Sequence, residues 1–212
     1  IEELPTYDGL MLHAIINMRQ WPNYVQSQGF VPSIPKDNKH VRCVTTLRDP
    51  LSRLRSLYLY ARSGGESWFR YESGIMQKLI QISRNESLTE SLKYFWNHFG
   101  KEYLIQSHEY MMMNLNRGCV GIKMEDLKRN YDENIHKLLD VWGVKKEIIP
   151  ILIKRLESSD LSRKTKTQKE SDPHITSNKF SKQLVSNVVR ILENMAEVKQ
   201  MLEEHRIELG YL

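Results

Sequence analysis

Short apolar runs, separated by longer amphipathic segments, set the expected order of elements along this chain. Residues 10–16, 41–47 and 119–124 are each apolar or β-branched and too short for a core helix, so they predict three buried strands. Buried strands that alternate with helices are typical of a parallel sheet with helices on both faces. The pattern therefore predicts an α/β fold with a three-layer α/β/α arrangement.

Apolar positions that recur every three or four residues predict the helices. In residues 50–61 the leucines share one face, and Arg53 and Arg55 are expected to point away from it. Asp49-Pro50 supplies an N-cap and a proline at the first helical position. Gly143 is expected to end another helix. Further helices are predicted over residues 71–84, 88–98, 101–114, 131–142, 146–158 and 179–206, the last of them broken near Met195.

The amino-acid composition and net charge of the chain indicate which kinds of molecule it could bind. The chain has 212 residues, enough for one α/β domain or two small ones, and its 40% hydrophobic content is that of a globular protein. Its formal charge of +5 is spread along the chain, which favours a polyanionic small molecule or an acidic glycan. Zinc-finger spacing and basic tails are missing from the sequence, so we expect no nucleic-acid partner.

The cysteines and the chain start bear on the cellular compartment. Cys43 and Cys119 each lie in an apolar run, which predicts two buried thiols in preference to a disulfide or a metal pair. The Asn85-Glu86-Ser87 sequon points faintly to secretion. No apolar run approaches the roughly 20 residues of a membrane span. Because the chain begins at Ile1 without a methionine, we expect it to be a fragment.

Arg48 is the first candidate for ligand binding. It follows the predicted strand 41–47, and ligands of open α/β sheets lie at the carboxyl ends of strands. Its guanidinium can pair with two phosphate oxygens. Ser56, nearly two turns into the next helix, can offer a hydroxyl to the same anion, and the helix N-terminus adds a favourable dipole. The segment therefore predicts a phosphate site.

This segment resembles the 3′-phosphate-binding motif of sulfotransferases that use PAPS (3′-phosphoadenosine 5′-phosphosulfate). The resemblance implies a P-loop-NTPase-like sulfotransferase fold and transfer of a sulfuryl group from PAPS to a hydroxyl of a carbohydrate or other small acceptor, with PAP as the product. The alternative is a strand–turn–helix with incidental surface arginines. The matching residues are Arg48, Asp49, Pro50, Arg53, Ser56 and Tyr58.

Two later segments extend the resemblance. Residues 121–127 are similar to the family's strand and Tyr-Glu-Asp-Leu segment, with Met124 in place of tyrosine; we favour a structural role for Glu125 and Asp126 over an acid/base pair. Residues 158–178 are predicted by composition to be a surface loop. Within that loop, one run is similar to a nucleotide-covering loop of uronyl 2-O-sulfotransferases, which implies contacts with the 3′-phosphate or adenine from Arg163, Lys164 and Thr165.

A transferase of this kind needs a base for the acceptor's hydroxyl proton, and histidine titrates near neutral pH. His13 lies in the predicted strand 10–16, and glycan sulfotransferases place a catalytic histidine in a comparable strand. A core histidine is the competing interpretation, and His40 and His174 are further candidates. Neither a Ser-His-Asp order nor metal-ligand spacing is present, so no metal is expected.

One part of the family pattern is missing from the sequence. The Lys-bearing loop that holds the 5′-phosphosulfate should precede His13, and no such segment is found there. We therefore expect residues 1–212 to form one partial sulfotransferase domain that is inefficient alone. One alternative is a non-catalytic nucleotide-binding relative. Another is a relative of the P-loop kinases, but it would need a Walker loop, which the sequence also lacks. Either the Golgi lumen, with a membrane anchor outside this chain, or the cytoplasm fits.

Overall fold

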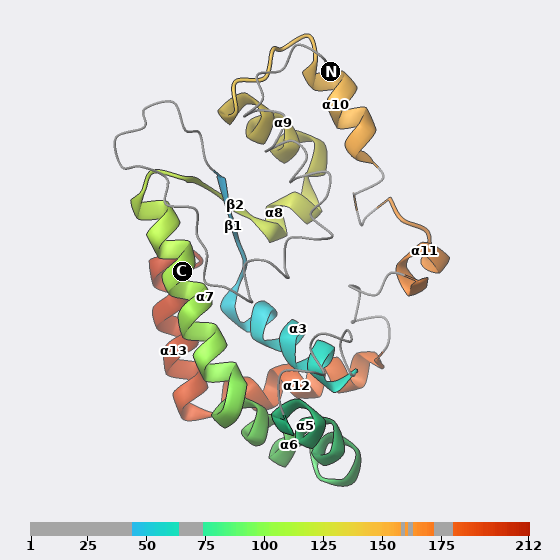
Figure 1. Ribbon diagram of the computed structural model, residues 1–212, viewed down its shortest axis with the longest axis vertical. Helices are drawn as coiled ribbons and strands as arrows, with labels where there is room; N and C mark the ends of the chain where they lie inside the picture. Colours follow the sequence, from blue (N-terminus) through green and yellow to red (C-terminus); the bar gives the residue numbers. More distant parts are fainter. Residues whose placement is uncertain (1–43, 64–73, 158–159, 161–162, 172–179) are drawn as a thin grey trace.

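Helices predominate in the computed structural model, around one two-stranded parallel sheet (Figure 1). The structure describes residues 44–63, 74–157, 160, 163–171 and 180–212. This combination of helices with a parallel strand pair is compatible with the predicted α/β class. The predicted strand 10–16 lies outside the described residues.

The two strands are β1 (Val44–Leu47) and β2 (Val120–Lys123), and they pair in parallel with Val44 opposite Val120. Both had been predicted from their apolar runs, and their parallel pairing is confirmed. Each strand leads directly into a helix, β1 into α3 (Pro50–Arg62) and β2 into α8 (Met124–Arg129). The N-termini of α3 and α8 therefore lie at the same carboxyl edge of the sheet.

The remaining helices follow the predicted order closely. The predicted break near Met195 is confirmed, because this residue has extended backbone angles (φ −80°, ψ 114°) between two helices. Gly143 ends its helix with a positive φ of 71°, which favours glycine. The elements are α5 (Gly74–Asn85), α6 (Leu88–Phe95), the π-helical η1 (Trp96–Gly100), α7 (Lys101–Asn116), α9 (Tyr131–Val141), α10 (Ile149–Leu156), α11 (Lys166–Ser171), α12 (Lys182–Asn194) and α13 (Ala196–Glu208).

Helix α11 corrects the prediction of an unbroken loop over residues 158–178. Thr165 and Gln168 form a reciprocal cap at its start. The Thr165 backbone N–H donates to Gln168 Oε1 at 2.8 Å, and Thr165 Oγ1 accepts from the Gln168 backbone N–H at 3.2 Å. A cap of this kind satisfies donors that a helix start leaves open, so a short polar helix forms without an apolar face.

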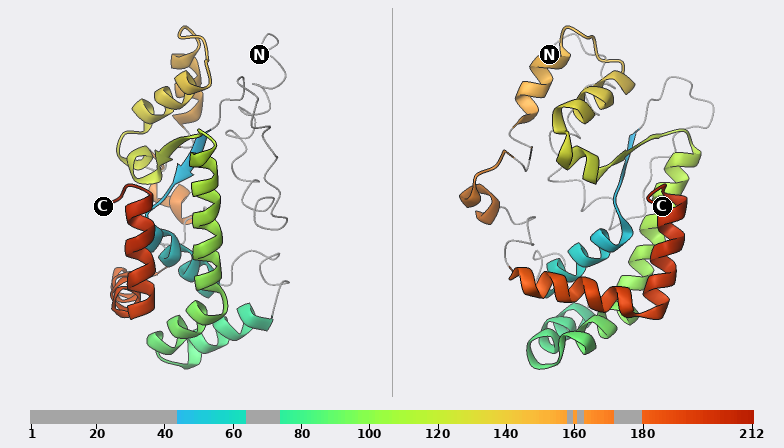
Figure 2. Two further views of the ribbon diagram at one scale, coloured as in Figure 1. Left: turned by 90° about the vertical axis from the view of Figure 1, so that its left-hand side faces the viewer. Right: turned by 180° about the vertical axis from the view of Figure 1, so that it is seen from behind.

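The main core is helical and surrounds α3. Tyr58 of α3 is fully buried and shares a 2.9 Å hydrogen bond with Ser91 of α6, so this motif residue has a structural position. Helices α7 and α13 lie side by side along one flank (Figure 2). Other buried members of this core are Leu54, Leu92, Phe95, Trp96, Leu104, Val188, Leu192, Val198 and Leu202.

Two smaller clusters complete the packing. One joins α9 to α10 through Ile135, Leu139 and Ile149. The other is formed by Leu47 of β1, Met111 of α7 and Leu209 near the C-terminus, and it ties the strand to the helical core. None of the helices within the described ranges combines the length and apolar character that crossing a bilayer requires.

Cys119, directly before β2, corrects the prediction for the cysteines. It is buried, at 7% exposed, as expected from its apolar neighbours, but it is bonded in a disulfide. The prediction of a buried thiol was therefore wrong for this residue. The other cysteine of the sequence, Cys43, lies outside the described residues.

Candidate functional site

Asp49 anchors the turn that follows β1. One carboxylate oxygen accepts a hydrogen bond from the Ser52 backbone N–H at 2.9 Å and caps α3. The other accepts from Nε of Arg206, in α13, at 2.7 Å. Burial alone would raise the pKa of Asp49, but the hydrogen bonds from Arg206 and Ser52 outweigh it and lower the pKa. Asp49 is thus held as a carboxylate that ties the start of α3 to α13.

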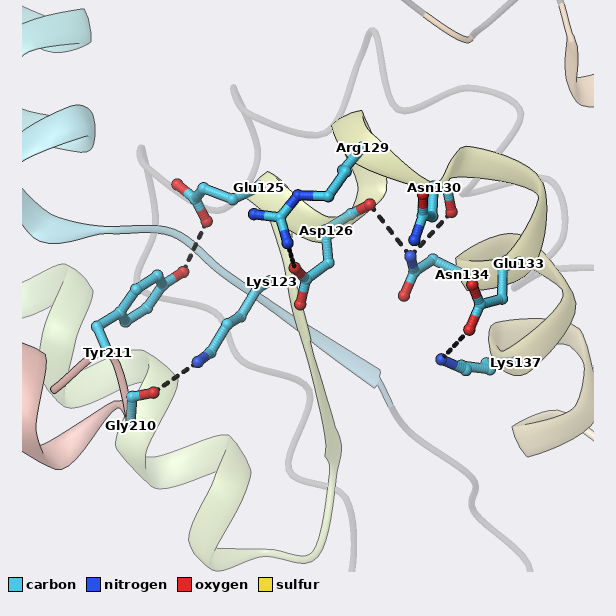
Figure 3. A network of polar contacts seen from close by, with 10 residues as sticks. All are labelled: Lys123, Glu125, Asp126, Arg129, Asn130, Glu133, Asn134, Lys137, Gly210 and Tyr211. Atoms are coloured by element: carbon cyan, nitrogen blue, oxygen red, sulfur yellow. Dashed lines mark hydrogen bonds and ion pairs between the residues drawn. The ribbon is translucent and has the colours of Figure 1, made fainter.

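Glu125 connects the ends of both strands to the C-terminal segment. One carboxylate oxygen accepts from the Asp49 backbone N–H at 3.2 Å, and the other accepts from the Tyr211 hydroxyl at 2.8 Å (Figure 3). Lys123 donates to the carbonyl of Gly210 and lies 4.5 Å from the centre of the Tyr211 ring. Because both of its oxygens are engaged, Glu125 has the structural role predicted for it.

Asp126 is also structural. Its carboxylate lies 3.9 Å from an Arg129 nitrogen, and its backbone carbonyl accepts from the Asn134 side-chain amide at 3.1 Å (Figure 3). These contacts link α8 to the start of α9. The pair formed by Glu125 and Asp126 therefore holds helices in place, which agrees with the interpretation favoured from the sequence.

Three cations converge near the carboxyl edge of the sheet. Burial lowers the pKa of Arg48, and the positive charge of Arg55 lowers it further. Burial also lowers the pKa of Lys128 in α8, followed by the charge of Arg48, with Glu125 opposing and Arg55 adding to the effect. The three cations thus influence one another electrostatically, while Tyr103, Glu125 and Asp49 act on the pKa of Arg48 in the opposite direction. In the part of the chain that the structure describes, none of the three forms an ion pair or hydrogen bond through its side chain.

Two serine hydroxyls of α3 share a helix face with one of these cations. Ser52, Arg55 and Ser56 are spaced by three and four residues and therefore share a helix face. All three are half-buried. The Ser56 hydroxyl has no hydrogen-bond partner among the described residues. A phosphate or sulfate is commonly bound by such a combination of cationic side chains, a free hydroxyl and a helix N-terminus.

Arg53 corrects the expectation that it points away from the apolar face. It is only 7% exposed, and one guanidinium nitrogen lies 3.5 Å from the sulfur of Met111. Burial lowers its pKa, and the charge of Arg48 acts in the same direction. Tyr103 of α7 faces both arginines: burial raises the pKa of its phenol, and the two positive charges partly offset the rise. Arg53 is therefore an interior residue and not part of the exposed surface.

The residues predicted to cover the nucleotide have other contacts in this structure. The Arg163 guanidinium forms ion pairs with three carboxylates, from Asp132 at 2.6 Å, Glu157 at 3.0 Å and Asp160 at 3.1 Å. The hydrogen bond that Arg163 donates to Asp132 raises the pKa of Arg163. Lys164 also has an interaction of its own, and Thr165 caps α11. Their nucleotide contacts stay predictions.

Sequence reasoning missed Lys128 and Arg55 as site residues. Lys128 follows the end of β2 by five residues, and Arg55 lies one residue before the predicted Ser56. Both lie in helices that follow the two strands, but only the parallel pairing of β1 with β2 brings the starts of these helices to one edge of the sheet. The candidate bases His13, His40 and His174 lie outside the described residues, so the identity of a base stays a prediction.

No family model, curated protein or solved structure matches this chain. The relation to PAPS-dependent sulfotransferases therefore stays a prediction based on the sequence motif. Within the described ranges, His, Cys, Asp and Glu side chains form no group of three or more that could hold a metal ion. The candidate site is accordingly defined by its cations and hydroxyls.

Proposed function

We propose that this chain belongs to a sulfotransferase that binds PAPS through its 3′-phosphate. The observation that carries the proposal is the convergence of Arg48, Arg55 and Lys128 without a carboxylate partner in the described chain. Arg48 and Arg55 are half-buried and Lys128 is exposed. Their like charges oppose one another, and an arginine cannot readily relieve this repulsion by losing its proton. A phosphate dianion relieves this repulsion, so the arrangement suits an anionic ligand.

In the proposed complex, each group has a separate task. The Arg48 guanidinium pairs with two oxygens of the 3′-phosphate, and the Ser56 hydroxyl donates to a third. The N-terminus of α3 adds its dipole, while Arg55 and Lys128 neutralise the remaining charge. Arg163 and Lys164 would reach the nucleotide only after Arg163 leaves its three carboxylates, so we assign them to a closing step.

The proposed reaction moves a sulfuryl group from PAPS to a hydroxyl of a carbohydrate or other small acceptor and releases PAP. Catalysis of such in-line transfers depends on positioning and on stabilising the departing phosphate. His13 is the proposed base. We further propose a three-layer P-loop-NTPase-like fold with residues 1–212 as part of one domain, working in the Golgi lumen or, alternatively, the cytoplasm.

The proposal is tested by titrating the chain with PAP and with AMP, which lacks only the 3′-phosphate, in a calorimeter. PAP should bind more tightly than AMP. Arg48→Ala should weaken PAP by about 2 kcal/mol, roughly 30-fold, because a bidentate charged contact is lost. AMP affinity should not change, and Arg84→Ala, at an exposed arginine of α5, should leave both affinities intact. Equal affinities of the wild-type chain for the two nucleotides would contradict the proposal.

Lys128→Ala should weaken PAP binding and at the same time slightly stabilise the free chain. The loss in affinity should be about 1 kcal/mol, or roughly fivefold, and should shrink at high salt, because the contact is mainly Coulombic. Stability without ligand should rise by a few tenths of a kcal/mol as repulsion from Arg48 and Arg55 is removed. Urea denaturation measures the second effect, with Lys145→Ala, at an exposed lysine, as the control. A loss of stability in Lys128→Ala would instead indicate a structural lysine.

A non-catalytic nucleotide-binding relative that retains only the 3′-phosphate site is the alternative. A transfer assay with labelled PAPS and a set of glycan and small hydroxyl acceptors distinguishes the two. PAP binding that depends on Arg48, without transfer to any acceptor, would favour the alternative. Transfer that is lost in His13→Ala, with PAP affinity retained, would support the enzyme.

A further inference from the structure

The Asn85-Glu86-Ser87 sequon lies at an exposed junction between two helices. Asn85 is the last residue of α5, and Ser87 is the N-cap of α6, where its hydroxyl accepts from the Glu90 backbone N–H at 3.2 Å. All three sequon residues are exposed. Helices α5 and α6 lie at the end of the molecule opposite α9 and α10 (Figure 1).

The Asn85 side chain is not used by the fold. Its amide makes no hydrogen bond with any residue that the structure describes. The junction of α5 and α6 also lies apart from α8 and from the two strands (Figure 1). A bulky group on Asn85 would therefore meet solvent and leave both the core and the candidate site unchanged.

The disulfide at Cys119 is an independent sign of the compartment. Structural disulfides form and persist in secretory and extracellular environments and are rare in the cytosol. The only other cysteine of the sequence, Cys43, directly precedes Val44, and Val44 pairs with Val120, the residue after Cys119. The two cysteines thus flank the same pair of strands in the sequence. In the secretory pathway, the compartment in which disulfides form is also the one in which sequons are modified, so the disulfide and the sequon point to the same location.

We propose that Asn85 carries an N-linked glycan. In this reaction the side-chain amide nitrogen of Asn85 forms a bond to the anomeric carbon of an oligosaccharide supplied by a lipid-diphosphate donor. The bond between that carbon and the lipid diphosphate breaks, the diphosphate leaves with the electron pair, and the amide loses one proton. The modification is independent of nucleotide binding, because Asn85 is exposed and is not part of the candidate site.

The test uses the protein isolated from the cells that make it. Treatment with a peptide N-glycosidase in heavy-oxygen water should convert Asn85 into a labelled aspartate, detected in the peptide by mass spectrometry, and should increase electrophoretic mobility. Asn85→Gln should abolish both changes. Ser87→Thr, which keeps the sequon hydroxyl and the helix cap, should retain them. An unlabelled Asn85 in the isolated wild-type protein would overturn the proposal.

A thiol-labelling arm tests the oxidised state that supports this assignment. Without reductant, Cys119 in the isolated protein should resist alkylation, and after reduction it should react. Alkylation of Cys119 without reductant, together with an unmodified Asn85, would indicate a chain that never entered an oxidising compartment and would reject the inference. Asn85→Gln should leave PAP affinity at the wild-type value, so failure of the glycan proposal and failure of the nucleotide proposal are distinguishable.

Discussion

Replacing Asp49 with alanine should lower the free energy of unfolding by about 3 kcal/mol, since two effects combine. Loss of the cap on α3 leaves the Ser52 backbone N–H without its 2.9 Å partner. Loss of the 2.7 Å contact leaves the partly buried Arg206 guanidinium uncompensated. The first effect typically costs about 1 kcal/mol and the second about 2 kcal/mol at a partly buried site. Urea denaturation followed by circular dichroism measures the sum.

Asp49→Asn separates the two contributions. The asparagine side chain keeps an oxygen that can cap α3 but loses the charge that holds Arg206, so about two thirds of the loss should remain. Asp140→Ala is the matched control, because Asp140 forms an exposed pair with His136 in α9, and its loss should cost less than about 0.5 kcal/mol. If Asp49→Ala behaves like Asp140→Ala, the anchoring role assigned to Asp49 is incorrect.

Features that depend on neighbouring residues in the chain could be predicted from the sequence. The Asp49 cap, the proline start of α3, the glycine that ends α9 and the break at Met195 are all set by backbone preferences within a few residues. The strands were predictable because their apolar runs are short and flanked by polar residues. Arg48 could be selected for the same reason, since it directly follows one of these runs.

Features that depend on the pairing of distant segments could not be predicted. Lys128 reaches Arg48 because β1 and β2 pair in parallel and place α3 and α8 at one edge, across 80 residues of sequence. Arg163 forms ion pairs with Asp132 in α9 and with Glu157 after α10, so an arginine of a run that is basic in sequence is engaged by carboxylates in the fold. Composition gives the charge of a loop but not its partners.

Arg53 and Cys119 show the same difference between what neighbouring residues predict and what distant residues determine. Arg53 was expected to point away from the apolar face because the leucines of residues 50–61 occupy that face. In the structure it is buried, with one guanidinium nitrogen 3.5 Å from the sulfur of Met111. Cys119 was expected to be a buried thiol because its neighbours are apolar, which is also the environment of a structural disulfide. In both cases periodicity does not reveal the partner: Arg53 is buried against Met111, far away in the sequence, and the apolar neighbours of Cys119 do not show that it is disulfide-bonded.

The stability of the chain should fall as the pH decreases from about 7 to about 5, because of His205 in α13. This residue is only 9% exposed, and its ring stacks on that of His108 with centroids 3.8 Å apart. Burial lowers the pKa of His205 to about 4; the charges of His108 and Arg53 act in the same direction, and Glu208 and Glu204 oppose them. The imidazole of the folded chain therefore stays neutral at pH values where it is protonated in the unfolded chain.

The direction of the change in stability with pH follows from how many protons the folded and unfolded states bind. An unfolded histidine has a pKa of about 6.5, so between that value and about 4 the unfolded state binds one more proton at His205 than the folded state does. Unfolding then takes up a proton, and stability decreases as the pH falls through this window. Down to pH 5 the loss should reach about 2 kcal/mol at most, and partial access of water reduces it toward about 1 kcal/mol. Carboxylates titrate mainly below this range, so they add little to the slope.

Urea denaturation at a series of pH values between 7 and 5 measures this slope directly. His205→Leu, which replaces the ring by an apolar side chain in the same buried position, should flatten it even if the variant is less stable at pH 7. His136→Gln should retain the wild-type slope, because His136 is an exposed residue of α9 paired with Asp140. The comparison depends on slopes and not on absolute stabilities, so a packing defect in His205→Leu does not obscure it. An unchanged slope in His205→Leu would mean that the proton taken up on unfolding binds to a different group.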